Sequence, residues 1–292
     1  CFSQCGIYCT RPGGMSAYTE EAHGKSAFFL CSYLYFLSLA IGNVAIAISA
    51  VGYLTPFLPW LGSGAIPLFV GSVGLIWLTS LANLGGPKVT GQIGSVTVWG
   101  VIIPVAGLSV IGWFWFDPEI FRQAWNPNGI ATSDAIAQSI PLTLWAFLGM
   151  ESAAQNSDAV ENPQRNVPLA CLLGTLGAAV VYVLSTSVIM GIVPNAELAN
   201  SSAPFAFVYA KMFNGWVGDI IMALAVMACV GSLLGWQFTL AQTAKVTAEQ
   251  GMFPRLFARV TLLGAPLLGL IANAVLQTGM AGWPISPNAS EQ

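Results

Sequence analysis

The sequence has very few charged residues for its length. Asp, Glu, Lys and Arg together make up 7% of its 292 residues. Soluble domains carry roughly 25% charged residues, so this composition excludes an ordinary soluble globular domain. Hydrophobic residues account for 55% of the chain, which is typical of a polytopic membrane protein.

Histidine is also nearly absent, since His23 is the only one. The chain contains no Gly-x-Ser-x-Gly, no His-Glu-x-x-His and no P-loop sequence. Its six cysteines are scattered along the sequence, and the single histidine is not a plausible partner for them in a zinc site. We therefore expect no enzyme, no metal, no cofactor and no nucleic-acid partner. An intramembrane enzyme remains as the remote alternative to a transporter.

The two ends of the sequence do not look like the natural termini of a protein. It begins at Cys1 without a methionine or a signal-peptide pattern, and it ends at Gln292 shortly after an apolar segment. We interpret it as an internal part of a longer protein. In this interpretation residues 1–25 form a cytoplasmic loop with the end of a truncated span, and 26–292 form a transmembrane domain.

Long apolar runs predict about seven membrane spans. A helix rises 1.5 Å per residue, so about 20 apolar residues cross about 30 Å of hydrocarbon. Gly85-Gly-Pro-Lys88 is expected to end the second span, because proline cannot continue a helix. The predicted spans are 26–53, 66–84, 96–116, 139–155, 167–192, 219–241 and 262–280.

The basic residues predict the orientation of these spans. Cytoplasmic loops of membrane proteins carry an excess of lysine and arginine. With seven spans, one side holds only Arg122 and Lys211. The other side holds the remaining seven, namely Arg11, Lys25, Lys88, Arg165, Lys245, Arg255 and Arg259. The N-terminal loop is therefore expected to be cytoplasmic.

Glu151 is the only carboxylate placed well inside a predicted span. A charge at that depth costs about 2.5–3.5 kcal/mol on insertion scales, and it commonly marks a functional site. Such a carboxylate can take up a proton or bind a cation, and a substrate ammonium would serve. The alternatives are a side chain that reaches the membrane interface, or one that is satisfied by a neighbouring helix.

Trp145 and Gly149 lie close to Glu151 in the same span. In an unbroken helix, six residues at 100° each would place Trp145 and Glu151 about 120° apart. Both can face one cavity if the helix unwinds near 147–149, as the broken helices of transporters do. Gly149 is the expected point of the break.

Two other spans offer polar or aromatic partners. In the sixth span, Ser232, Trp236, Thr239 and Thr243 recur at helical spacing and are expected to face the bundle. Trp236 could bind a cation through its ring, with plain packing as the alternative. Asn43 in the first span is either an interhelical hydrogen-bonding residue or a ligand contact.

Several strings resemble the basic amino acid/polyamine antiporters of the amino acid–polyamine–organocation superfamily. Two further strings look closest to the putrescine–ornithine antiporter branch, and the likeness covers essentially the whole chain. The first group is Leu144-Trp-Ala-Phe-Leu-Gly-Met-Glu-Ser-Ala153, Glu161-Asn-Pro-Gln-Arg-Asn-Val-Pro168 and Gly231-Ser-Leu-Leu-Gly-Trp-Gln-Phe-Thr-Leu-Ala-Gln242, and the second group is residues 39–53 and 90–100.

The resemblance implies an all-α transmembrane bundle, part of a LeuT-like inverted-repeat fold whose helices three to nine match the seven spans. It places Glu151 and Trp145 on a broken helix that meets the substrate amine, with Trp236, Asn43 and Tyr35 facing the same pathway. The family's first helix holds the substrate carboxylate with a Gly-Ser-Gly-type segment, and the likeness matches none of the seven spans to that helix. The 292 residues alone are therefore expected to be inactive.

The resemblance also implies a function. It predicts putrescine:ornithine exchange by alternating access in the bacterial inner membrane, with a proton-coupled amino acid permease as the alternative. The expected partners are a small cationic amine or amino acid and the lipid bilayer, and a homodimer is left open as the assembly.

Overall fold

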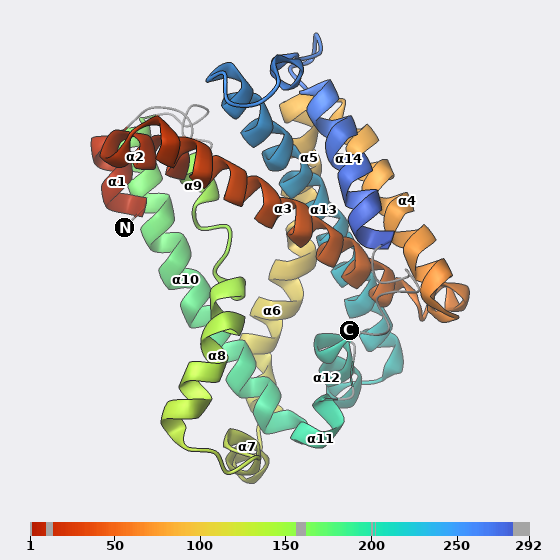
Figure 1. Cartoon of the computed structure of the whole chain (residues 1–292). Helices are drawn as coiled ribbons and strands as arrows, with labels where there is room; N and C mark the ends of the chain where they lie inside the picture. The colour runs from red at the N-terminus through yellow and green to blue at the C-terminus, as the bar shows by residue number, and fades with distance from the viewer. Residues whose placement is uncertain (1, 10–13, 156–161, 200, 202, 283–292) are drawn as a thin grey trace. The chain divides into compact units, whose positions relative to one another are not determined.

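The computed structural model is all-helical over the residues that it describes, which are 2–9, 14–155, 162–199, 201 and 203–282 (Figure 1). The chain divides into two compact units. The first unit comprises Cys1–Cys31 and Val105–Ser201, and the second comprises Ser32–Pro104 and Ser202–Gln292. Cys1, Arg11 and residues 283–292 lie outside the described residues.

Five helical runs in the described part of the chain are long and apolar enough to cross a membrane. Four of them agree closely with the predicted first, second, fifth and sixth spans. The five runs are Lys25–Leu54, Ala65–Asn83, Gly86–Trp115, Gln164–Ile192 and Gly215–Glu249.

The third run begins ten residues before its predicted start at 96. It consists of α5 (Gly86–Thr97), α6 (Trp99–Ile111) and a short 3-10 turn at Gly112–Trp115. The prediction took Gly85-Gly-Pro-Lys88 only as a stop for the preceding helix. The structure also uses it as a start, with Pro87 in the first turn of α5, where its missing N–H is not needed.

The predicted fourth and seventh spans are not single long helices. Residues 139–155 fall in α8 (Thr132–Ala146) and α9 (Ser152–Gln155), which are separated by a turn. The predicted 262–280 begins in a turn with Gly264 at φ +79°, and helix α14 runs only over Leu267–Gly282. Both segments are apolar, but neither contains 18 consecutive helical residues.

The first unit is built around the long helix α10 (Pro163–Ile192). Helix α1 packs on α10 near one end and α7 packs on it near the other. Helix α7 lies between the predicted third and fourth spans, and it begins where Asp117 accepts a hydrogen bond from the Glu119 amide at 2.8 Å. The short helices of this unit include α1 (Phe2–Tyr8), α2 (Gly14–His23), α7 (Pro118–Trp125) and α11 (Asn195–Leu198).

A buried cluster of the second unit draws on four helices, and two of its four residues are alanines. Ala47, Ile76, Leu233 and Ala274 form a fully buried cluster to which α3 (Lys25–Leu54), α4 (Ala65–Asn83), α13 (Gly215–Glu249) and α14 each contribute one residue. Such small residues let helices approach closely in lipid, where there is no hydrophobic force between them. Figure 1 shows α4, α13 and α14 side by side.

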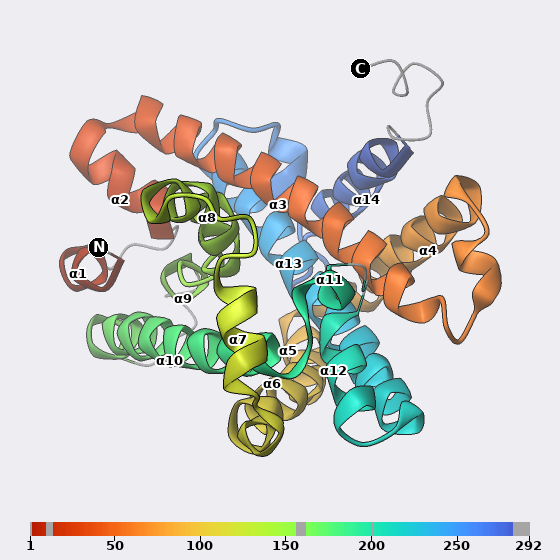
Figure 2. The same cartoon turned by 90° about the horizontal axis from the view of Figure 1, so that it is seen from below.

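Helix α13 makes the most extensive contacts of the second unit. It packs against α5, α4, α14 and α12 (Pro204–Met212), and Figure 2 shows α12 beside it. A Cβ at Gly231 would overlap the side chain of Thr97 on α5, and one at Gly100 would overlap the backbone of Leu224. These two glycines therefore set the distance between α13 and the α5–α6 run.

Candidate functional site

The helix that was expected to carry Glu151 is interrupted. Helix α8 ends at Ala146, residues 147–151 are in turns, and α9 begins at Ser152. Gly149 has φ +110°, a conformation that side-chain-bearing residues rarely adopt. The interruption lies in the segment 147–149 for which a break is predicted. That this break brings Trp145 and Glu151 to one cavity stays a prediction.

Glu151 closes this turn with its own side chain. Its Oε2 accepts a hydrogen bond from the Gly149 amide at 2.8 Å, and Ser152 Oγ donates to the Gly149 carbonyl at 2.6 Å. Glu151 is 6% exposed, and it is the only Asp, Glu, Lys or Arg among the described residues whose side chain is buried.

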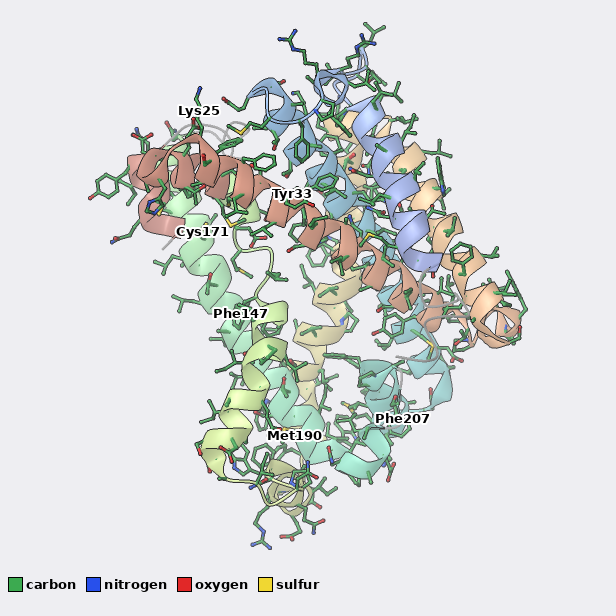
Figure 3. The ribbon with its side chains drawn as sticks, viewed as in Figure 1. Lys25, Tyr33, Phe147, Cys171, Met190 and Phe207 are labelled. Carbon is green, nitrogen blue, oxygen red and sulfur yellow. The ribbon has the colours of Figure 1, made fainter. Side chains whose placement is uncertain are left out.

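Helix α10 supports the interrupted segment at two levels along its length, one at Tyr182 and one at Cys171. Tyr182 donates its hydroxyl to the Ala146 carbonyl at 2.9 Å, which satisfies a carbonyl that the end of α8 leaves open. Its ring also meets Phe147 edge-on at 5.5 Å between centroids. One level further, Cys171 Sγ lies 3.5 Å from the Met150 carbonyl. Figure 3 labels Phe147 and Cys171 at these two levels.

A small apolar cluster holds α9 in place. Ala154 packs with Val167 and Cys171 of α10, and Tyr18 of α2 covers them. Burial raises the pKa of Tyr18 to about 12, and the thiols of Cys9 and Cys5 add to the effect. The tyrosine is therefore neutral at physiological pH, and it closes the cluster as an uncharged ring.

Trp145 belongs to α8, but its side chain lies outside the described residues. The remaining predicted site residues, Tyr35, Asn43 and Trp236, lie in the second unit. Gly149 and Glu151 are hydrogen-bonded neighbours in the first unit. That these two sets of residues face one cavity stays a prediction.

Asn43 and Tyr35 are both buried on α3. Asn43 is 1% exposed, and neither of its amide atoms has a hydrogen-bond partner among the described residues. One interpretation from the sequence was an interhelical hydrogen bond of Asn43, and the described residues contain no partner for it. Tyr35 is 9% exposed, so its ring is largely covered within the described structure.

Trp236 is half-buried on α13, and only some residues of the predicted polar stripe around it are buried. Thr239 and Thr243 are buried, but each hydroxyl donates to a carbonyl of its own helix, at 3.1 and 2.9 Å. Ser232 is exposed. The threonines of the stripe therefore have their hydrogen bonds without a ligand.

Sequence reasoning missed a set of buried amides in the second unit. Gln237, Asn273 and Gln277 are each at most 2% exposed, in helices that are otherwise apolar. Gln237 belongs to α13, and Asn273 and Gln277 both belong to α14. Amide side chains are rare in apolar helices, because buried polar groups in membranes are costly unless they are paired. This rarity was the signal in the sequence that could have identified them.

The described site combines a buried carboxylate with a break in an apolar helix. Glu151 contributes negative charge at a break where backbone amides and carbonyls are within reach. No group of three or more His, Cys, Asp or Glu side chains that could hold a metal occurs in the described ranges. That this arrangement recognises an ammonium group stays a prediction.

Comparison with known proteins gives consistent results. The amino acid permease family matches residues 1–285. The chain is 54% identical to the putrescine transporter PotE of Escherichia coli strain K12, over 100% of this chain and 66% of that protein. It is 52% identical to the putrescine transporter PotE of Haemophilus influenzae, over 100% of this chain and 67% of that protein.

A further relative is the cadaverine/lysine antiporter of Escherichia coli strain K12, 36% identical over 92% of this chain and 60% of that protein. The chain thus spans about two thirds of the length of the curated relatives it matches. These relatives are named as transporters and an antiporter. The family match over nearly the whole chain, together with the apolar helices, identifies an integral membrane protein of the amino acid permease family.

Proposed function

We propose that the protein exchanges putrescine for ornithine across the bacterial inner membrane by alternating access, and that it is not an enzyme. The identity of 52–54% to proteins named putrescine transporters supports the amine. The 36% identity to a protein named an antiporter supports exchange. The observation that carries the proposal is the buried Glu151 at a break in an apolar helix.

In this proposal Glu151 receives an ammonium group of the substrate. Putrescine carries an ammonium at each end, and ornithine carries a side-chain ammonium together with an amino acid group. A buried carboxylate neutralises such a cation, and hydrogen bonds to charged groups contribute about 1.5–3 kcal/mol. Trp145 and Trp236 would add cation–π contacts of about 0.5–2 kcal/mol each. Asn43 and Tyr35 would line the same pathway.

The sequence in hand is proposed to be inactive by itself. It covers about two thirds of the length of its relatives, and the resemblance matches none of its spans to the helix that holds the substrate carboxylate. The transport experiments below therefore use the full-length protein, with residues 1–292 alone as a comparison. We expect no accumulation of putrescine by residues 1–292 in liposomes.

Exchange is tested directly with purified full-length protein in liposomes. Radiolabelled putrescine should enter liposomes loaded with ornithine, and its uptake into unloaded liposomes should be at least about tenfold slower. Uptake that needs no internal ornithine but follows an imposed proton gradient would support the alternative, a proton-coupled amino acid permease. Conversion of putrescine to another compound would instead indicate an enzyme.

The orientation is proposed from the basic residues, with the N-terminal loop in the cytoplasm. Lys25 and Arg122 are both exposed and lie on opposite predicted sides. In a protein without native cysteines, Lys25→Cys should react with an impermeant thiol reagent only in inside-out vesicles. Arg122→Cys should react only in right-side-out vesicles, and the reverse pattern would refute the orientation. A homodimer, the proposed assembly, is tested by light scattering of the purified protein.

A further inference from the structure

Two amides of α14 lie buried against its neighbours in the second unit. Asn273 is 2% exposed and Gln277 is fully buried. They are four residues apart, so they occupy the same face of the helix, one turn from each other. That face is directed at α4 and α13, the helices beside α14 in Figure 1.

Gln277 joins a hydrogen-bond network centred on Gln237 of α13. Gln237 Oε1 accepts from the hydroxyls of Thr79 at 2.7 Å and Ser80 at 3.3 Å. Gln237 Nε2 donates to the Ile76 carbonyl and to Gln277 Oε1, each at 3.1 Å. The Thr79 hydroxyl has one hydrogen and also lies 2.8 Å from the Leu75 carbonyl. Gln237 uses both of its donors, and it links α13 to α4 and to α14.

The network is incomplete on its α14 side. Gln277 Nε2 and both amide atoms of Asn273 are buried and have no hydrogen-bond partner among the described residues. Turning the Gln277 amide over does not help, because its Nε2 would then face the Gln237 Nε2, donor against donor. Buried amides without partners are costly, most of all where no bulk water reaches them.

The chemistry of these atoms defines the ligand that fits them. Two amide nitrogens offer N–H donors, and Asn273 Oδ1 offers the one carbonyl acceptor. A metal ion would need several oxygen ligands. An anion would need positive charge, and neither α4 nor α14 contains a charged residue. A water molecule accepts two hydrogen bonds and donates two, which satisfies such a set.

We propose that Asn273 and Gln277 bind a buried water molecule. The water accepts from Gln277 Nε2 and Asn273 Nδ2 or donates to Asn273 Oδ1, and it completes the network that joins α4, α13 and α14. Gln237 follows Trp236 in sequence, so the water-completed network fixes α13 at the level of that tryptophan. Only this last consequence, for substrate binding, rests on the proposed function.

Replacement of Asn273 by leucine tests the water site in the purified full-length protein. Leucine has a similar volume and makes no hydrogen bond. If the amide binds water, Asn273→Leu should lower Tm by about 2–4 °C, the shift expected for roughly 1 kcal/mol in a domain of this size. If the amide has no ligand, the same variant should raise Tm, because a buried unpaired polar group is removed. A raised Tm overturns the proposal.

A matched control is Val275→Leu, on the exposed side of the same helix. It should leave Tm within about 1–2 °C, as surface substitutions usually do. The double variant Asn273→Leu with Gln277→Leu should lose more than Asn273→Leu alone, because Gln237 then also loses its partner on α14.

A second measurement decides the matter even if Asn273→Leu fails to fold. A density map of the unmodified full-length protein, at a resolution that shows ordered water, should contain a peak within about 2.7–3.2 Å of Gln277 Nε2 and an Asn273 amide atom. A well-ordered map with no peak there overturns the proposal. Neither readout depends on the substrate, so a failure of putrescine exchange leaves both results valid.

Discussion

Each unit has a helix that carries a predicted binding residue, and the two helices differ in their continuity. In the first unit the helix with Glu151 is interrupted, and side chains replace the lost helical hydrogen bonds. In the second unit α13 continues through Trp236 for 35 residues, and its threonines bond to its own carbonyls. The broken helix places backbone groups and a charge in the interior, whereas the intact helix supplies a rigid surface.

The difference also appears in how the two helices are held. Helix α13 is fixed by close contacts along its length, including the one between Gly231 and Thr97. The interrupted segment depends on a few individual contacts from α10, mainly those of Tyr182 and Cys171. We infer that substitutions at the close contacts of α13 affect stability most, and that those in the interruption affect transport more than stability.

The largest loss of stability is expected at the contact between α13 and α5. A Cβ at Gly231 would overlap the Thr97 side chain, so Gly231→Ala should cost about 3 kcal/mol of unfolding free energy. Thermal denaturation of the purified protein in detergent measures it. Gly235→Ala, one turn further along the same helix with open space around it, should be neutral or stabilise by up to about 1 kcal/mol. Equal effects of the two would contradict the close contact.

A smaller loss is expected at the interruption itself. Alanine at position 149 would have to adopt φ +110°, which costs about 1–3 kcal/mol. Gly149→Ala should therefore lower Tm and reduce putrescine exchange by more than its loss of folded protein explains. Gly177→Ala on α10, where a Cβ meets open space, serves as the control and should leave exchange unchanged. Normal exchange in Gly149→Ala would argue against a role for this turn.

A modest loss is expected when the Tyr182 hydroxyl is removed. Tyr182→Phe keeps the edge-on contact with Phe147 but loses the hydrogen bond to the Ala146 carbonyl. It should destabilise the protein by about 1 kcal/mol, visible as a lower Tm. An unchanged Tm would mean that the end of α8 is satisfied in another way.

The smallest effect is expected within α13. The Thr239 hydroxyl bonds only to the Gly235 carbonyl of its own helix, so Thr239→Val should change stability by less than about 0.5 kcal/mol. Putrescine exchange should also stay near that of the unmodified protein. A loss of exchange with unchanged Tm would show that the stripe on α13 does contact the substrate.

The sequence predicted the long apolar helices well because their signal is local. Lys25–Leu54 and Ala65–Asn83 agree with the predicted spans to within one residue. The early start of α5 was missed because proline ends one helix and begins another with the same local pattern. The interruption before Glu151 was predicted from the need to bring Trp145 and Glu151 to one cavity, together with a glycine at position 149.

The buried amide network could not be predicted from the sequence. Gln237 and Gln277 are 40 residues apart, and Gln237 and Thr79 are 158 apart. Hydrogen bonds over such separations leave no periodic pattern, because each helix contributes only one or two polar residues. The same limit applies to the predicted site, whose residues come from distant helices and are grouped by resemblance to the family.

The most direct test of the central claim is putrescine exchange by the Glu151→Gln variant of the full-length protein in ornithine-loaded liposomes. Loss of the charge should reduce exchange about 10–100-fold, the equivalent of 1.5–3 kcal/mol of interaction with the ammonium. Glu119→Gln, the same change at an exposed glutamate of α7 that pairs with Arg122, should leave exchange unchanged. Equal exchange by Glu151→Gln and the unmodified protein would contradict the account.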